Sequence, residues 1–257
     1  FAGLKAAGES EKYPLDYYEN NVFGSMVLLQ EMKKANVKSI IFSSSASVYG
    51  NAQNVKCKED TQLNPISVYG KTKLIIEDML KSIYKSSPEW KIINLRYFNP
   101  IGAHSTGIIG EDFRNKPTNL IPFITDVALG KKDQLLVFGN DYNTNDGTGK
   151  RDYIHIEDLA RGHLFALEKL SKEINICRDI NLGTGKSYSV IEVIKAFESA
   201  SGEKIPYQII ERREGDIAEI CADPTFALNF LGWEAKFDLE RMCVDSWRWK
   251  VMNPNGY

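Results

Sequence analysis

The stretch that decides the fold begins at residues 38–50, KSIIFSSSASVYG, and continues as SVYGKTKLIIEDMLKSIYK over 67–85 and KIINLRY over 91–97. Short apolar runs at 39–43 and 91–97, each bounded by polar residues, are typical of buried strands. Between them, apolar residues recur at helical spacing and Pro88 follows, so a helix is predicted from about Ser67 to Lys85. Strand, helix and strand in succession indicate an α/β fold with a largely parallel sheet.

The same alternation extends along the rest of the chain. Helical spacing predicts further helices over 16–35, 156–170, 189–201 and 239–252, and Ser189 precedes Glu192 by the three residues of a capping box. Long polar loops, notably 139–149, separate the later elements. We therefore expect residues 1–100 to form a sheet domain and residues 101–257 to form mainly a smaller, loop-rich domain, with some segments returning to the sheet.

The composition argues against several classes of protein. The chain of 257 residues has 32 basic and 34 acidic side chains, for a net charge of −2, and no basic stripe of the kind that binds nucleic acid. No apolar run approaches the roughly 20 residues that span a bilayer, so we expect no membrane insertion. The four cysteines are widely separated and the three histidines do not cluster, so we expect no disulfide, no metal site and a cytoplasmic location.

One pair of residues could carry acid–base chemistry. Tyr69 and Lys73 lie four residues apart, which places them on one helix face, and a nearby ammonium should lower the pKa of a phenol. Ser45 lies at the end of the preceding strand, at the sheet edge where open α/β sheets bind ligands. The alternative interpretation is an exposed tyrosine beside a solvated lysine, with the serines serving as ordinary turn residues.

Several motifs in one colinear order carry a resemblance to a known family. They are FSSSASVYG at 42–50, YGKTK at 69–73, RYFNP at 96–100, FGNDY at 138–142, DGTG at 146–149, RDYIH at 151–155 and RREGD at 212–216. Together they make the chain similar to the UDP-galactose 4-epimerases of the extended short-chain dehydrogenase superfamily. The resemblance covers essentially the whole chain and implies a Rossmann-like doubly wound parallel sheet with a smaller mixed α/β domain for the substrate.

The resemblance also implies a role for individual residues. Ser45, Tyr69 and Lys73 match the catalytic serine, tyrosine and lysine of the family. The positions that line the NAD site are Phe1, Ala2, Gly3, Leu4, Lys5, Asn20 and Phe98, together with the catalytic three. The positions that hold the UDP part of UDP-glucose or UDP-galactose are Asn99, Asn119, Leu120, Phe138, Arg151, Tyr153, Arg213 and Asp216.

The chemistry of these side chains agrees with those roles. A guanidinium presents a planar fork of donors that suits a diphosphate, and a carboxylate such as Asp216 suits ribose hydroxyls. Arbitrary arginines and aspartates would more often be surface salt-bridge residues. The resemblance further implies a homodimer, built from the helices at 16–35 and 67–85.

The chain departs from the family pattern at its start. It begins Phe1-Ala2-Gly3, and no glycine-rich turn that could cradle a dinucleotide pyrophosphate opens it, so we interpret the start as a fragment boundary with an initial βαβ portion missing. The resemblance also implies that the size of the side chain at Ile220 affects whether N-acetylated sugars fit.

Two alternatives to an epimerase remain open. A nucleotide-sugar dehydratase would need an Asp-Glu pair after the strand-end hydroxyl to protonate the leaving hydroxide, but Ala46 and Ser47 stand there. A non-catalytic UDP-sugar-binding module would not need Ser45, Tyr69 and Lys73 together. An epimerase that uses NAD as an internal hydride store is therefore the favoured interpretation.

Overall fold

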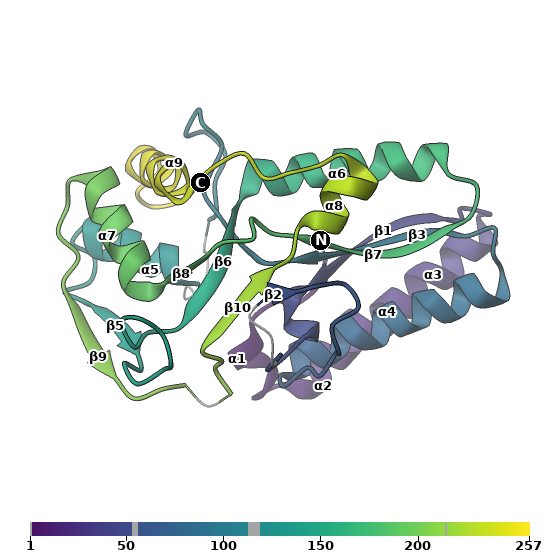
Figure 1. Ribbon diagram of the computed structural model, residues 1–257, viewed down its shortest axis with the longest axis horizontal. Helices are drawn as coiled ribbons and strands as arrows, with labels where there is room; N and C mark the ends of the chain where they lie inside the picture. The colour runs from purple at the N-terminus through teal and green to yellow at the C-terminus, as the bar shows by residue number, and fades with distance from the viewer. Residues whose placement is uncertain (1, 53–55, 113–118, 214) are drawn as a thin grey trace. The chain divides into compact units, whose positions relative to one another are not determined.

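The computed structural model describes residues 2–52, 56–112, 119–213 and 215–257. The chain divides into two compact units. Figure 1 shows the chain coloured by residue number. The first contains residues up to Phe98, Arg161–Leu182 and Asp223–Trp233. The second contains Asn99–Ala160, Gly183–Ala222 and Glu234–Tyr257.

A parallel sheet with strand order β1-β3-β7 forms the centre of the first unit. Its strands are β1 (Ser39–Ser45), β3 (Lys91–Tyr97) and β7 (Ile176–Leu182), paired in register from Ser39 opposite Lys91 to Ser45 opposite Tyr97. The predicted strand over 91–97 and the parallel sheet are confirmed. All three strands thus end together, and their carboxyl edge carries Ser45 and Tyr97.

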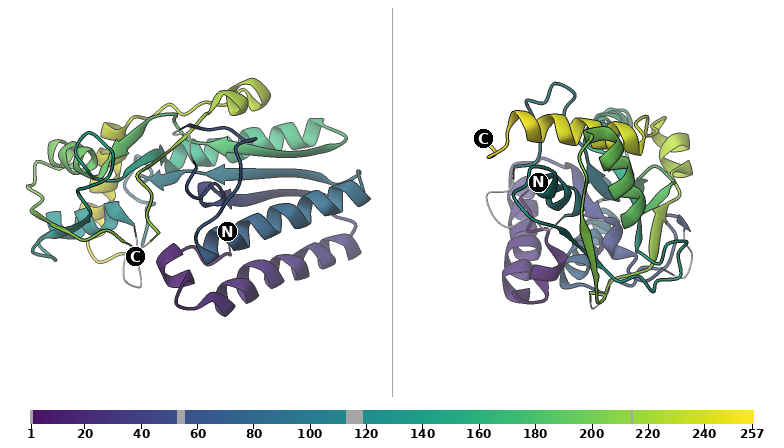
Figure 2. Two further views of the ribbon diagram at one scale, coloured as in Figure 1. Left: turned by 60° about the horizontal axis from the view of Figure 1, so that its bottom comes forward. Right: turned by 90° about the vertical axis from the view of Figure 1, so that its left-hand side faces the viewer.

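Helices cover both faces of this sheet (Figures 1 and 2). On one face, α3 (Gly24–Lys34) and α4 (Val68–Ser86) bury Leu29, Ile76 and Leu80 against Trp90 and Ile92. The other face is covered by α6 (Ile156–Lys172), which begins in the second unit's segment and continues in the first. The remaining elements of the unit are α1 (Ala7–Ser10), α2 (Pro14–Tyr17), the 3-10 helix η2 (Ala46–Val48), β2 (Lys56–Cys57) and α8 (Thr225–Leu231).

The prediction of one regular helix over 16–35 was wrong in one respect. Between α2 and α3 the chain forms a π-helix, η1 (Tyr18–Phe23). A π-helical turn adds a residue and is frequent at functional sites. Here it carries the neighbouring amides of Asn20 and Asn21.

The second unit is built on a mixed sheet. Its strands β10 (Glu219–Ala222), β6 (Lys150–His155) and β4 (Asn99–Ile101) are parallel neighbours, and β8 (Ser187–Ser189) pairs antiparallel with β6. A second pair, β5 (Leu135–Phe138) with β9 (Tyr207–Ile210), is also parallel. Three helices, α5 (Leu120–Ala128), α7 (Val190–Ser201) and α9 (Leu239–Met252), close the core of this unit around Ile124, Phe197 and Met242.

Local sequence accounts for where several helices begin. The Oγ of Ser67 accepts a hydrogen bond from the Gly70 N–H at 3.0 Å and caps α4. The predicted capping box of α7 is confirmed, because Ser189 and Glu192 each accept the other's backbone N–H. Such caps satisfy N–H groups that have no partner within the helix. In the described part of the chain, no helix combines the length and the apolar character that a membrane crossing requires.

Candidate active site

The structure brings Ser45, Tyr69 and Lys73 together within the first unit. Ser45 ends β1, Tyr69 lies in the first turn of α4, and Lys73 follows one turn later. The Ser45 side chain lies close enough to the Tyr69 phenol to lower the pKa of that group. The Nζ of Lys73 donates to the carbonyl oxygen of Ser43 at 2.9 Å and lies 5.6 Å from the centre of the Tyr69 ring. A hydroxyl, a phenol and an amine therefore meet at the carboxyl edge of the sheet.

The expected effect of Lys73 on the phenol was wrong for this structure. Burial raises the pKa of Tyr69 above its usual value, and the Ser45 side chain opposes that rise only in part. The Lys73 amine lies over the Tyr69 ring, 5.6 Å from its centre. Burial also lowers the pKa of Lys73 to about 8, because the residue is only 7% exposed and its charged form is poorly hydrated there.

The first turn of α4 is tied to the start of the chain. The Tyr69 N–H donates to the Oγ of Ser10 at 3.0 Å, and the Val68 N–H donates to Glu11 at 2.7 Å. Gly70 allows this turn to pack closely against η2, because a Cβ at this position would lie 2.6 Å from the carbonyl oxygen of Ser47. Only glycine fits without moving the backbone.

A second tyrosine, Tyr97, contacts Ser43 of β1, and it was not predicted from the sequence. The Tyr97 hydroxyl donates to the Oγ of Ser43 at 2.9 Å and also contacts the Nε2 of His163. Burial raises the pKa of Tyr97 to about 12. Since Ser43 also holds the Lys73 ammonium through its carbonyl, Tyr97 fixes the residue on which Lys73 rests.

The segment expected to line the NAD site is held by the two π-helical asparagines. The Asn20 side chain donates to the Ala2 carbonyl at 3.0 Å, while the Asn21 amide accepts from the Leu4 N–H at 2.8 Å and donates to its carbonyl at 3.0 Å. Asn21 was not predicted, although it is buried where its neighbour Asn20 is exposed. Phe1 lies outside the described residues, and Lys5 is exposed.

The geometry around Lys73 fits a dinucleotide ribose. A Cβ built on Gly3 would lie 3.4 Å from the Lys73 Nζ, so the backbone there passes directly beside the buried amine. An ammonium has three donors, and Ser43 takes one of them. A buried cation with donors to share suits the hydroxyl pair of a ribose. Phe98, also expected at the NAD site, is 3% exposed, and its ring centre lies 6.4 Å from that of Tyr49.

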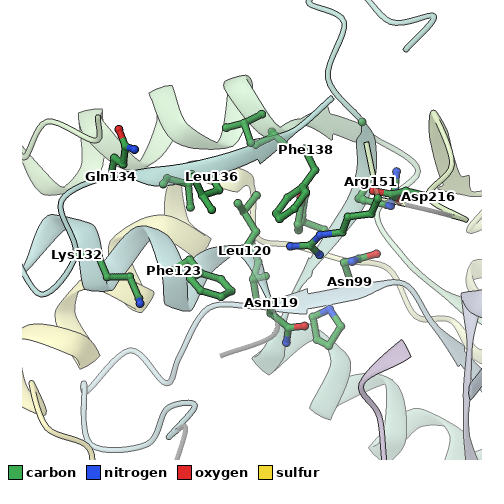
Figure 3. A pocket seen from close by; sticks show the side chains of 18 of the residues that line it. Asn99, Asn119, Leu120, Phe123, Lys132, Gln134, Leu136, Phe138, Arg151 and Asp216 are labelled. Carbon is green, nitrogen blue, oxygen red and sulfur yellow. The ribbon is translucent and has the colours of Figure 1, made fainter. Parts of the chain in front are cut away.

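A pocket of about 660 Å³ lies in the second unit (Figure 3). It is lined by residues of β4, α5, β5 and β6 and by the loop before β10. All the residues that the family resemblance assigned to UDP line it, namely Asn99, Asn119, Leu120, Phe138, Arg151, Tyr153, Arg213 and Asp216. Positions up to 117 residues apart (99 and 216) thus converge on one cavity.

Both arginines that line this pocket have partners within the protein. Arg151 forms an ion pair with Asp216, and its Nη1 donates to the Ile217 carbonyl at 2.8 Å. The Arg213 guanidinium carbon lies 3.7 Å from the centre of the Phe138 ring, and burial lowers the pKa of this group. Arg151 is therefore fixed by protein partners, whereas Arg213 is stacked on an aromatic ring.

The far end of the pocket contains side chains that the motifs did not indicate. Phe123, Lys132, Gln134 and Leu136 lie beyond Leu120 in Figure 3, and the Lys132 amine is 5.8 Å from the Phe123 ring centre. Apolar walls with a few polar ends suit a nucleotide base. No sequence signal indicated them, because the two apolar residues look like core residues and Lys132 and Gln134 look like ordinary loop residues.

Ile220 lies on β10 opposite Arg151 of β6 and is 5% exposed. It does not line the pocket of the second unit. All four cysteines are free, and the described residues contain no cluster of three or more acidic, histidine or cysteine side chains that could hold a metal ion.

Comparisons with known proteins agree with this geometry. A protein-family model described as the NAD dependent epimerase/dehydratase family matches residues 1–183. The chain is 52% identical over 257 residues to the UDP-glucose 4-epimerase of Dictyostelium discoideum, covering 100% of this chain and 75% of that protein. It is 53% identical to the UDP-glucose 4-epimerase of Bacillus subtilis (strain 168), covering 100% of this chain and 76% of that protein.

A solved structure shows the same fold. The crystal structure of UDP-glucose 4-epimerase from Bifidobacterium longum, in complex with NAD+ and UDP, superimposes with a TM-score of 0.96 at 48% identity. The superposition covers 100% of this chain and 76% of that chain. The α/β fold with a Rossmann-type parallel sheet is therefore confirmed.

Proposed function

Because this chain belongs to the NAD dependent epimerase/dehydratase family, we propose that it catalyses the reversible 4-epimerisation of UDP-galactose and UDP-glucose with NAD as its cofactor. The enzyme is an isomerase: the sugar is oxidised to a transient 4-keto form and reduced on its other face. The single observation that supports this most directly is the meeting of the Tyr69 phenol, the Ser45 side chain and the buried Lys73 amine at one place. Mere binding of a nucleotide sugar would need no such set.

Tyr69 is the group that moves the proton of the sugar's 4-hydroxyl. Its hydroxyl oxygen accepts that proton when the ketone forms and donates it back when the ketone is reduced. The Ser45 side chain favours the phenolate against the effect of burial. NAD, when bound, supplies reversible hydride acceptance. Lys73 would hold the ribose next to the nicotinamide through the donors that Ser43 leaves available.

The second unit anchors the nucleotide. Arg151 and Arg213 both line the pocket and would contact the diphosphate, and Asp216 would bind ribose hydroxyls. Phe138, with Leu120 and Phe123, offers apolar surface for the base. Strong remote contacts of this kind let the sugar itself be held weakly, so that the keto intermediate can turn over in the site.

This division assigns NAD binding and catalysis to the first unit and mainly UDP-sugar binding to the second. Elimination is disfavoured, because Ala46 and Ser47 provide no acid next to Ser45 that could protonate a leaving hydroxide. A 4-epimerase also accounts for the retention of Ser45, Tyr69 and Lys73, which a binding module would not.

The assembly we propose is a homodimer formed through η1, α3 and α4. These elements expose apolar side chains, among them Phe23 at 54% and Leu28 at 53%. Exposed apolar surface of this kind marks interaction sites. The proposed location is the cytoplasm, which suits four free cysteines.

The test of the function is interconversion of UDP-galactose and UDP-glucose by the complete, NAD-loaded enzyme and by its Tyr69→Phe variant. We expect the substitution to lower kcat by about 100-fold or more while UDP affinity stays unchanged, because the pocket of the second unit is untouched. Tyr13→Phe is the matched control, since Tyr13 is 57% exposed. Wild-type turnover in Tyr69→Phe would exclude the phenol as the acid–base group.

A further inference from the structure

Helix α4 is fastened to strand β1 by three contacts at helical spacing. Tyr69, Lys73 and Glu77 follow one another at intervals of four residues, so they lie along one face of α4. The Tyr69 phenol lies beside the Ser45 side chain, which lowers its pKa. Lys73 donates to the Ser43 carbonyl at 2.9 Å, and Glu77 accepts from the Ser44 hydroxyl at 2.6 Å. We call these three contacts the α4–β1 ladder.

The third contact is the most deeply buried. The side chain of Glu77 is 0% exposed and that of Arg96 is 1% exposed. Arg96 donates to both Glu77 oxygens, at 3.0 Å and 2.7 Å, in a bidentate pair. Arg96 is also the register partner of Ser44 across β1 and β3. The carboxylate of Glu77 therefore joins a helix to two adjacent strands at one point.

The Glu77–Arg96 pair has a further partner, Asp179 of β7, which is itself paired with α4. Arg96 donates to Asp179 of β7 at 2.8 Å, and Asp179 accepts from Lys81 of α4 at 2.7 Å. The Asn94 amide donates to the other Asp179 oxygen at 2.8 Å. All three strands of the sheet and the helix thus share one network, which resists sliding of α4 along the sheet.

We propose that Glu77, through Arg96, is a positioning residue for the epimerase reaction: it sets the axial position of α4, and so the alignment of Tyr69 with Ser45. Eight residues of helix separate Glu77 from Tyr69, roughly 12 Å along the axis, so Glu77 acts on the phenol only through the helix. This inference rests on the proposed function. The inference goes beyond the proposed function, because it assigns a role in the reaction to two residues that would contact neither the sugar nor the cofactor.

A purely structural ion pair would make a different prediction. Removing one partner of a buried pair is destabilising, whereas replacing both by apolar side chains of similar volume is often neutral. If Glu77 and Arg96 only stabilise the fold, replacing both should restore stability and kcat together. If they also align α4, stability should return while kcat stays low.

The experiment compares variants of the complete, NAD-loaded enzyme. Glu77→Leu combined with Arg96→Met removes both charges, and Asp179 keeps Lys81 and Asn94 as partners. Ser44→Ala is the mild variant, because it removes the contact of Glu77 with β1 and leaves the Glu77–Arg96 pair intact. Leu80→Ala is the matched control, since Leu80 is a 0% exposed residue of the same helix outside the ladder.

Three quantities are measured: kcat and KM for UDP-galactose, the thermal midpoint, and the Tyr69 pKa by NMR titration of ring-labelled tyrosine, assigned by its absence in Tyr69→Phe. For the double variant we expect a midpoint close to wild type, kcat lower by about 10- to 100-fold, unchanged KM and a raised Tyr69 pKa. Ser44→Ala should change kcat and the Tyr69 pKa in the same directions by less. Leu80→Ala should lower the midpoint and leave kcat and the Tyr69 pKa unchanged.

Wild-type kcat and Tyr69 pKa in a folded double variant would overturn the proposal. If the double variant fails to fold, Ser44→Ala decides alone: an unchanged Tyr69 pKa and kcat there would equally overturn it. The proposed function fails separately, if wild-type enzyme and Tyr69→Phe do not differ in epimerisation.

Discussion

Replacing Lys73 by methionine should make the protein more stable while removing its activity. Lys73 is 7% exposed, and burial lowers the pKa of its amine from 10.5 to about 8. At 1.36 kcal/mol per pH unit, that difference corresponds to roughly 3 kcal/mol by which folding disfavours the charged form. Methionine has similar length and no charge, so Lys73→Met should stabilise the protein by about 2–3 kcal/mol at pH 7.

The lowered pKa of Lys73 determines how the stability of the wild-type protein changes with pH. Below about pH 8 the amine is charged in both the folded and the unfolded protein, so the full cost of burying it is present. Between about pH 8 and 10.5 the unfolded chain holds this proton and the folded protein releases it. Wild-type stability therefore rises with pH across that window relative to Lys73→Met, and the advantage of the variant shrinks by roughly 3 kcal/mol.

The assay is urea denaturation of both proteins at a series of pH values from 6 to 10.5. Lys71→Met is the matched control, because Lys71 is an exposed residue of the same helix and its replacement should change stability by no more than about 0.5 kcal/mol. A stability difference between wild type and Lys73→Met that does not vary with pH would refute the reasoning. So would a variant less stable than wild type at pH 7.

Three further substitutions test other parts of the structure. Gly70→Ala would place a Cβ 2.6 Å from the Ser47 carbonyl oxygen, so we expect a lower thermal midpoint and kcat reduced by about 10- to 100-fold; wild-type kcat would show that the close approach is unimportant. Arg151→Met removes the ion-pair partner of Asp216 and should weaken UDP binding by about 10- to 100-fold in calorimetry, whereas unchanged affinity would exclude Arg151 from the site. Ser189→Ala should cost about 1 kcal/mol of unfolding free energy in urea, and no loss would mean that the cap of α7 contributes nothing.

Local patterns predicted the five longest helices of the described chain and two strands of the central sheet, but not β7, α5 or the strands of the second unit. The strand over 91–97 and the helix over 239–252 have the predicted bounds, and the helix predicted from about Ser67 begins at Val68, directly after its cap Ser67. These features depend on side-chain periodicity and on hydrogen bonds between residues three or four apart, which the chain carries in its local order. The π-helical turn at 18–23 has no comparable signal and was missed.

Part of the candidate site could also be predicted from sequence. Tyr69 and Lys73 share a helix face by spacing alone, and colinear motifs indicated the residues that line the UDP pocket. The motifs did not indicate Phe123 or Lys132 at its far end, because a periodic apolar or basic residue looks the same on a pocket wall as elsewhere.

The sequence by itself determined the longest helices, two strands of the central sheet and, through the family resemblance, many of the residues that meet at the site. Only the tertiary structure decided the electrostatics of that site. Burial raises the pKa of Tyr69 against the expectation from its lysine neighbour, and it lowers the pKa of Lys73. The pairs of Glu77 with Arg96 and of Arg151 with Asp216 join different elements. Desolvation and long-range pairing depend on what the folded chain brings around a group, and no local stretch of sequence contains that information.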